Sequence, residues 1–286
     1  MATGLNEWQR DWPAPAKINL FLHVVGRRAD GYHLLQTVFR FLDFGDTLRF
    51  TPRNDDAIVA VNPLPGVDPE TDLTVRAARL LRQTFGGKSG VAIVLEKRIP
   101  MGGGLGGGSS DAATTLLALN RLWACGLSVP ELEALGLQLG ADVPIFIHGH
   151  SAFAEGIGER FSDVAPPPAW YLVTMPRCAV PTPAIFGAAD LRRDTPAIAP
   201  ADWQPGCGGN DLEPVACRLF PEVAAHLAWL RQHAPARMSG SGACCFAEFA
   251  SEAAALAVLA VMPVEMRGVV AAGIDRHPLR ELYEIA

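Results

Sequence analysis

Apolar residues occupy every second position in an early segment of the chain, residues 18–24. This alternation has the period of two that is typical of a half-buried strand, with apolar side chains on one face and other side chains on the opposite face. The pattern predicts that Lys17, Asn19 and His23 lie together on one face of that strand.

Later segments predict strands and helices that are interleaved along the whole chain. We expect strands at residues 37–44, 47–51, 57–62, 91–96, 170–174, 243–249 and 267–274, and helices at 72–85, 112–123, 183–189, 221–233 and 251–261. A proline-rich stretch at residues 161–168 is suited to a domain boundary. The order of the elements favours an α+β fold of two domains, residues 1–160 and 161–286, over a doubly wound sheet.

Composition and charge indicate an ordinary globular enzyme. The 286 residues are 49% hydrophobic and 19% charged, which argues against disorder, and the net charge of −6 argues against a nucleic-acid-coating surface. We expect no signal peptide in Met1 to Trp12 and no membrane span, because no apolar run is long enough. Six cysteines without a C-x-x-C pair favour reduced thiols and a cytoplasmic location.

The most informative segment is a glycine-rich run at residues 100–111, between the strand at 91–96 and the helix at 112–123. Its sequence is Pro-Met-Gly-Gly-Gly-Leu-Gly-Gly-Gly-Ser-Ser-Asp. Glycines allow backbone N–H groups to converge on an oxyanion, and the N-terminus of the following helix adds unpaired donors and a positive dipole end. Ser109 or Ser110 is suited to cap that helix. We interpret the run as a phosphate cradle.

Other readings of the glycines fit less well. A dinucleotide fingerprint needs a strand that leads straight into the first glycine, whereas residues 97–100 intervene here. The Walker pattern ending at Gly87-Lys88-Ser89 requires a glycine where the chain has Arg82. A flexible linker would not explain the embedded Leu105 or the Ser-Ser-Asp helix start.

Four further segments are candidates for chemistry, and each has a structural alternative. Residues 15–19 carry Lys17, which in the simpler reading lies at the solvated edge of a strand. Residues 140–144 carry Asp142, which in the simpler reading is a helix N-cap. Residues 238–243 form a glycine turn. Its simpler role is to join two strands of a hairpin, and its alternative role is to close over a ligand. Tyr32 and His33 follow a turn, where such residues are often merely half-buried.

Taken together, these segments resemble the GHMP kinase superfamily. The similarity runs from about residue 13 to about residue 275 and is carried by residues 15–20, 28–33, 102–110, 140–144, 153–156, 210–212 and 239–243. The resemblance implies an N-terminal ATP-binding domain like ribosomal protein S5 domain 2 and a ferredoxin-like, substrate-binding C-terminal domain. The active site would lie in the cleft between them.

The same resemblance implies an ATP-dependent kinase. Its narrower motifs imply transfer of the γ-phosphoryl group to the 2-hydroxyl of diphosphocytidyl methylerythritol in the non-mevalonate route to isoprenoids. The alternatives are another small alcohol, such as mevalonate or homoserine, or a non-enzymatic sensor that keeps the scaffold. The implied partners are small molecules only, with no nucleic acid or membrane, and the chain is expected to be a monomer or weak homodimer.

Site residues follow from the matching positions. Lys17 and Asp142 match the catalytic pair, with Asp142 as the base that accepts the hydroxyl proton. The expected ATP-binding residues are Lys97, Pro100, Met101, Gly102, Gly103, Gly104, Leu105, Gly106, Gly107, Gly108, Ser109 and Ser110. The expected substrate-binding residues are Asn19, Tyr32, His33, Thr182 and Phe186, with Tyr32 and Phe186 on either side of the cytosine and His33 at its polar edge. The glycine turn near the site comprises Ser239, Gly240, Ser241 and Gly242.

Two departures from the family pattern bear on nucleotide binding. Asp72 stands where an asparagine bordering the adenine is expected, and Asp111 stands where asparagine also occurs in relatives. The charge of Asp111 would repel phosphate unless a metal intervened. Mg²⁺ is expected to enter as a complex with ATP, and its protein ligands are left unassigned.

Overall fold

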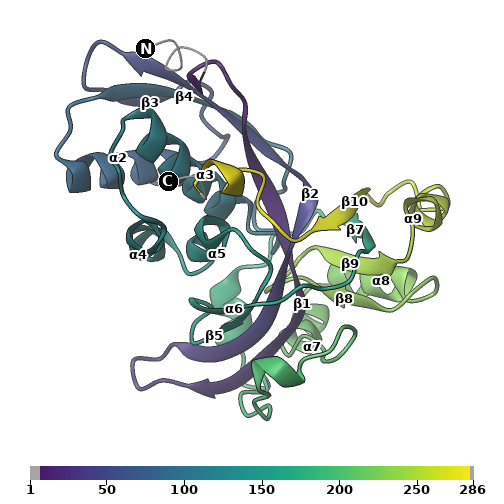
Figure 1. Cartoon of the computed structure of the whole chain (residues 1–286). Helices are drawn as coiled ribbons and strands as arrows, with labels where there is room; N and C mark the ends of the chain where they lie inside the picture. Colours follow the sequence, from purple (N-terminus) through teal and green to yellow (C-terminus); the bar gives the residue numbers. More distant parts are fainter. Residues whose placement is uncertain (1–6, 284–286) are drawn as a thin grey trace.

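Two long antiparallel strands, β1 (Trp12–Arg27) and β2 (His33–Arg53), run through the middle of the molecule and join its two halves (Figure 1). The computed structural model describes residues 7–283, so part of the N-terminal segment expected to lack a signal peptide lies outside it. Within the described chain, no helix is both long and apolar enough to cross a bilayer.

The remaining elements fall into an earlier and a later group along the chain. The earlier group comprises β3 (Ile58–Ala60), α2 (Leu73–Phe85), β4 (Gly90–Glu96), α3 (Gly107–Leu122), α4 (Val129–Leu139), α5 (Val143–His148), β5 (Ala152–Glu155) and β6 (Arg160–Asp163). The later group comprises β7 (Trp170–Thr174), α6 (Thr182–Phe186), η1 (Pro200–Asp202), α7 (Glu213–Leu219), α8 (Pro221–Leu230), β8 (Ala236–Met238), β9 (Cys245–Phe249), α9 (Glu252–Leu259), β10 (Gly268–Ile274) and η2 (Arg280–Leu282).

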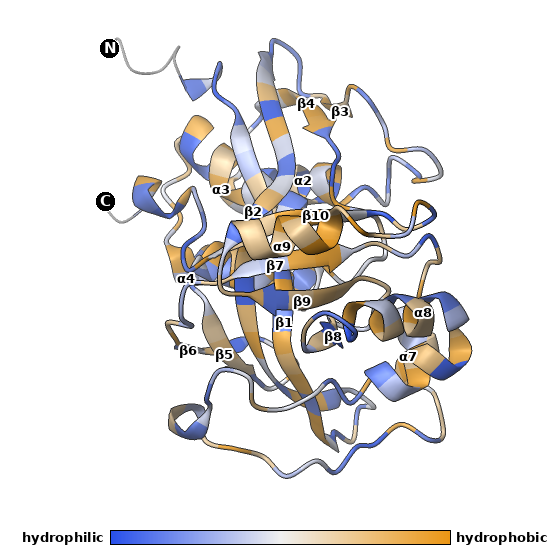
Figure 2. Ribbon diagram, turned by 90° about the vertical axis from the view of Figure 1, so that its right-hand side faces the viewer, coloured by the Kyte–Doolittle hydropathy of each residue, from blue (hydrophilic) through white to orange (hydrophobic). Residues whose placement is uncertain are grey.

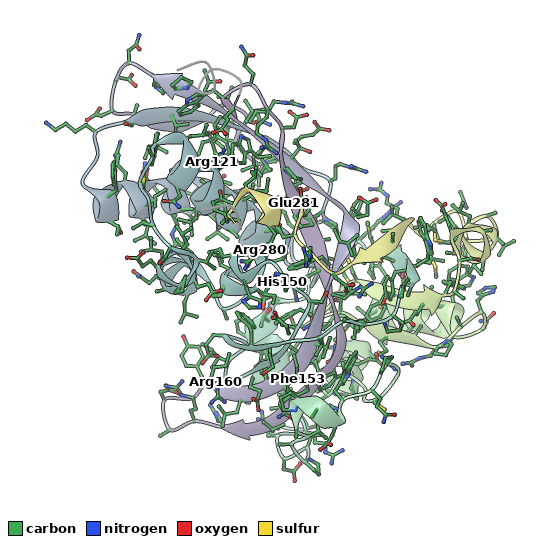
Figure 3. The ribbon with its side chains drawn as sticks, in the orientation of Figure 1. Arg121, His150, Phe153, Arg160, Arg280 and Glu281 are labelled. Carbon is green, nitrogen blue, oxygen red and sulfur yellow. The ribbon has the colours of Figure 1, made fainter. Side chains whose placement is uncertain are left out.

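One continuous sheet connects the two groups. Its strand order is β3-β4-β2-β10-β7-β9-β8, and β1 and β5 also pair with β2. The joint lies where β10 pairs with β2 on one side and β7 on the other. After β10 the chain returns to the first half of the molecule, where Arg280 lies (Figure 3). The Arg280 side chain donates a hydrogen bond to the carbonyl of His148, at the end of α5.

The apolar core has three parts that follow this layout. Helices α2 to α5 cover the first half of the sheet, and α7 and α8 pack beside β8 and β9 in the second. A third cluster lies where β1 and β2 meet β7, β9 and β10, whose apolar residues are visible at the centre of Figure 2. The mixed α and β architecture expected from the sequence is confirmed, whereas the division at residues 160 and 161 stays a prediction.

The face assignment of the first strand was correct for Lys17 and Asn19, which lie side by side, and wrong for His23. Lys17, Asn19 and Phe21 are buried as well as the alternating aliphatic residues, because both faces of β1 are covered. The pairing of β1 with β2 also shifts register between Asn19 and Leu22. Such an irregularity moves the following side chains to the opposite face. Leu22 therefore joins Lys17 and Asn19 beside the cavity described below, and His23 packs against Phe21 at a ring distance of 4.9 Å.

The helix after the glycine run also begins earlier than expected. Its first residue is Gly107 and its N-cap is Gly106, so Ser109 and Ser110 lie inside the helix and neither caps it. Gly106 has a φ of 73°, which a glycine adopts without strain. Helices α4 and α7 and strands β5, β6 and β8 were not predicted, because short apolar segments there gave no clear period. Helix α5 was expected only in the simpler reading of Asp142 as a helix N-cap.

Candidate active site

A cavity of about 860 Å³ opens between the two halves of the molecule. Its walls are the β1–β2 hairpin, the glycine loop, the residues before α5, the segment around α6 and the turn at residues 240–242. Segments that are distant in the sequence thus converge on one space, as the resemblance implied. Of the expected site residues, Lys97, Leu105, Ser110 and Ser239 are not part of its lining.

The glycine loop lies along the cavity at the N-terminus of α3. Gly102, Gly104 and Gly106 all have positive φ angles between 68° and 74°. A Cβ atom on Gly104 would lie 2.2 Å from the carbonyl oxygen of Ser239, so that position leaves room for no side chain. The 16-residue helix α3 presents unpaired N–H groups and its positive dipole end behind the loop. This arrangement is suited to a chain of phosphates.

The loop is held by both halves of the molecule. The carbonyl of Leu105 accepts from the amide of Lys17 on β1 at 2.9 Å, and the carbonyl of Gly103 accepts from the amide of Cys244 at 2.9 Å. The Ser239 hydroxyl donates to the carbonyl of Gly104 at 2.9 Å. Leu105 and Ser239 therefore support the loop from behind, although neither lines the cavity.

Lys17 and Asp142 form an ion pair in the cavity wall, with 3.1 Å between Nζ and Oδ2. The Lys17 side chain is 2% exposed, whereas that of Asp142 is 38% exposed. Asp142 occupies the N-cap position of α5, yet its side chain accepts no capping hydrogen bond, so the simpler reading as a cap does not use its carboxylate. The pair thus offers an open proton acceptor beside a fixed positive charge.

Neighbouring polar groups orient the lysine. Its Nζ donates to Oδ1 of Asn19 at 2.7 Å, and the Asn19 amide donates to the Thr37 hydroxyl at 2.9 Å. The same Nζ lies 5.2 Å from the centre of the Phe39 ring, at a distance typical of a cation–π contact. Since the ammonium is enclosed by these groups, its position is fixed before any ligand binds.

The residues expected to bind a pyrimidine line a part of the same cavity, called its pyrimidine end below. Tyr32 is 60% exposed, and His33 and Phe186 pack with 4.9 Å between their ring centres and an angle of 31° between their planes. The hydroxyls of Thr182 and Ser241 are 2.8 Å apart and link α6 to the glycine turn. Tyr32, His33, Thr182 and Phe186 all line the cavity.

Lys97 lies beneath the loop rather than in the cavity. Its Nζ is 2.5 Å from Asp46 and 2.7 Å from Asp111, both of which are buried. Burial raises the pKa of the Asp111 carboxyl and Lys97 counteracts that rise. Asp111 therefore has a protein cation as its partner, at 2.7 Å. A direct contact of Lys97 with ATP stays a prediction.

The carboxylate of Asp72 is also occupied within the protein. It accepts from the amide and hydroxyl of Thr74 and from the amide of Val75, and it caps α2. The next residue, Leu73, lines the cavity instead. No cluster of three or more His, Cys, Asp or Glu side chains suited to a metal ion occurs in residues 7–283.

Arg193 was missed by the sequence analysis although it contacts two expected site residues. Its guanidinium donates to the ring of His33 and to the carbonyl of Phe186. The arginine lies in a charged stretch, residues 190–194, that carries no motif or apolar period. Only its position in the folded chain distinguishes it from Arg192, its neighbour.

Comparison with known proteins gives matches along most of the chain. The family described as GHMP kinases N terminal domain matches residues 72–150, and GHMP kinases C terminal matches residues 197–266. A protein of Dechloromonas aromatica strain RCB named 4-diphosphocytidyl-2-C-methyl-D-erythritol kinase is 64% identical over 272 residues, which cover 95% of this chain and 99% of that protein. A protein of the same name from Thiobacillus denitrificans is 59% identical, over 94% of this chain and 96% of its own length.

Solved structures agree with these matches. A crystal structure of 4-(cytidine 5'-diphospho)-2C-methyl-D-erythritol kinase superposes with a TM-score of 0.79 at 37% identity, over 92% of this chain and 99% of that one. A homoserine kinase from Cytophaga hutchinsonii superposes with a TM-score of 0.67 at 16% identity, over 93% and 94% of the two chains. At that identity the second likeness concerns the fold alone.

Proposed function

The chain belongs to the GHMP kinases and, within them, to the 4-diphosphocytidyl-2-C-methyl-D-erythritol kinases, and from this membership and the cavity geometry we propose how it catalyses phosphoryl transfer. The acceptor is the 2-hydroxyl of diphosphocytidyl methylerythritol, the donor is the γ-phosphoryl group of ATP, and the product is the 2-phosphate in the non-mevalonate isoprenoid pathway. The Lys17–Asp142 pair at the edge of the phosphate cradle is the single observation that carries this proposal.

In the proposed reaction, Asp142 accepts the proton of the substrate hydroxyl. The hydroxyl oxygen bonds to the γ-phosphorus, and the bond from that phosphorus to the bridging oxygen breaks, which releases ADP. Such a transfer depends mainly on positioning and on stabilisation of charge. Lys17 is suited to stabilise the transferring phosphoryl group, because its ammonium is buried, oriented by Asn19 and 3.1 Å from the base.

We propose that the glycine loop and the N-terminus of α3 hold the phosphates of ATP. The positive φ angles at Gly102, Gly104 and Gly106 and the exclusion of a Cβ at Gly104 support this assignment. Bound together with the nucleotide, Mg²⁺ would supply neutralisation of the phosphate charge, and no protein residue is assigned as its ligand. The six cysteines form no disulfide within the described chain, which supports a reducing, cytoplasmic setting. A monomer or weak homodimer remains our expectation.

A coupled ADP-release assay tests the proposed function. The purified protein is given ATP, Mg²⁺ and, in separate reactions, diphosphocytidyl methylerythritol, mevalonate or homoserine. We expect turnover with the cytidyl substrate and at least about a hundredfold lower kcat/KM with the others, because they leave the polar groups of the pyrimidine end unpaired. Comparable turnover of mevalonate or homoserine, or none of the cytidyl substrate, contradicts the assignment.

The pyrimidine end of the cavity gives a second prediction. If Tyr32 and Phe186 enclose the cytosine, each ring contributes about 1–3 kcal/mol of stacking. Tyr32→Ala and Phe186→Ala should then each raise the KM for the cytidyl substrate by about 5- to 150-fold, at about 1.4 kcal/mol per decade. The KM for ATP should stay within about twofold, since the phosphates bind at the glycine loop.

Phe85→Ala provides the matched control, because Phe85 is a partly exposed aromatic residue that does not line the cavity. Initial rates at varied concentrations of each substrate measure both constants. Unchanged constants for the cytidyl substrate in both site variants would show that the two rings do not bind the base. An equal rise in both KM values would indicate a general loss of structure instead.

A further inference from the structure

Arg193 connects the two segments that carry the pyrimidine-binding residues. Its Nε donates to Nε2 of His33, on β2, at 3.1 Å, and its Nη2 donates to the carbonyl of Phe186, at the end of α6, at 3.0 Å. Further bonds to the carbonyls of Ala188 at 2.7 Å and Leu191 at 2.9 Å fix the guanidinium. His33 and Phe186 lie 153 residues apart in the sequence (186 − 33), so this contact arises only in the folded chain.

The bond to Arg193 determines where the His33 ring carries its proton. A guanidinium has donors only, so the His33 nitrogen that faces it must be an acceptor. A neutral imidazole has one N–H, and with Nε2 as acceptor that N–H is on Nδ1. Within residues 7–283, Nδ1 of His33 has no hydrogen-bond partner, and the residue lines the cavity. A donor is therefore available to a ligand.

The surroundings also favour the neutral ring. Burial lowers the pKa of His33, and two cations lower it further: Arg193, from the segment after α6, and Arg27, from the end of β1. Arg27 is itself held by a hydrogen bond from its Nε to the carbonyl of Gly31 at 3.1 Å. At neutral pH the imidazole is uncharged, and the hydrogen bond from Arg193 places its single proton on Nδ1.

We propose that Arg193 is a positioning residue that holds His33 as a hydrogen-bond donor at Nδ1 and thereby selects cytosine over uracil. The proposal rests on the proposed function and attributes the enzyme's preference for cytosine to the contact between Arg193 and His33. Cytosine presents an unprotonated N3, an acceptor that matches the Nδ1–H of His33. Uracil carries a proton on N3, which places two donors opposite each other and leaves both unpaired. Arg193 acts through His33 and does not itself touch the base.

The main test compares Arg193→Met with Arg192→Met. Arg192 is the matched control, because it is the adjacent arginine, is 59% exposed and pairs only loosely with Asp194 at 3.6 Å. We expect Arg193→Met to raise the KM for the cytidyl substrate about tenfold, with kcat and the KM for ATP within about twofold. Arg192→Met should leave all three constants within about twofold.

Selectivity is measured by inhibition with cytidine 5'-diphosphate and uridine 5'-diphosphate against the cytidyl substrate at saturating ATP. The wild type should prefer the cytidine compound at least about tenfold, and Arg193→Met should reduce that preference to about threefold or less. An unchanged preference in Arg193→Met, or the same loss in Arg192→Met, overturns the proposal.

A pH profile separates tautomer control from simple packing. Removing the cation raises the pKa of His33, and below that pKa both ring nitrogens carry protons, so Nδ1 again donates. The KM defect of Arg193→Met should therefore be smaller at pH 6 than at pH 8, whereas the wild-type KM stays level. A defect of equal size at both pH values contradicts the proposed role.

One measurement needs no folded variant at position 193. Nitrogen-15 spectra of the wild-type protein report which ring nitrogen carries the proton, and comparison with His33→Gln assigns the signal among the seven histidines. We expect protonation at Nδ1 and a bare Nε2; the reverse overturns the inference. If the wild type does not phosphorylate the cytidyl substrate, the proposed function itself fails, whereas normal turnover with protonation at Nε2 rejects only the role of Arg193.

Discussion

Replacing Asp142 by asparagine is expected to lower kcat by about 10²–10⁴, the usual contribution of general-base catalysis. The change removes a proton acceptor but almost no volume, and the amide still fits beside Lys17, whose Nζ lies 3.1 Å from the carboxylate. Binding of both substrates should persist, since neither the glycine loop nor the pyrimidine end depends on the carboxylate. The loss should therefore appear in kcat and much less in either KM.

Asp275→Asn is a matched control for the loss of charge. Asp275 also pairs with a buried cation, Arg40, which is 2% exposed, and its own side chain is 48% exposed, much like that of Asp142. This second pair does not line the cavity. We expect lower stability to denaturant in the control but unchanged kcat. If turnover of Asp142→Asn stays within about threefold of the wild type while the control behaves as expected, Asp142 is not the base.

The sequence was sufficient for features that depend on neighbouring residues. The glycine run, the strand before it and the helix after it were all predicted, because backbone conformation and apolar period are local properties. The simpler reading of Asp142 as the N-cap of a helix, based on the glycine before it and the apolar run after it, placed it correctly before α5. Convergence of these segments on one cavity came from the family resemblance, since no local pattern encodes it.

Features that depend on distant partners were not predicted. The register shift in β1 moved His23 out of the cavity, and it depends on the pairing with β2. Asp111 pairs with Lys97, which also pairs with Asp46, a residue 65 positions before Asp111 (111 − 46). The contact of Arg193 with His33 joins positions in different halves of the molecule. Buried ion pairs and hydrogen bonds of this kind leave no periodic trace in a sequence.

The glycine loop gives the second large prediction, at Gly106. A Cβ atom at this position would lie 2.8 Å from Cζ of Phe146 and 3.1 Å from Cε of Lys17. Phe146 is fully buried and packs against Phe41 at a ring distance of 5.6 Å, so it has little room to move. The strain therefore falls on the Lys17 side chain and on the first turn of α3.

Gly106→Ala is expected to lower kcat/KM for ATP by about a hundredfold, because a displacement of about 1 Å in a catalytic group has effects of that size. Gly126→Ala isolates the effect of the contact, since Gly126 has the same φ of 73° as Gly106 but a Cβ added there would meet nothing within 4 Å. Both variants place an alanine in the left-handed region, which destabilises the folded state by roughly 1–2 kcal/mol. Only Gly106→Ala should lose activity, as measured by initial rates at varied ATP. Equal kcat/KM values in the two folded variants would mean that the loop at Gly106 is a connector and that the phosphates bind elsewhere.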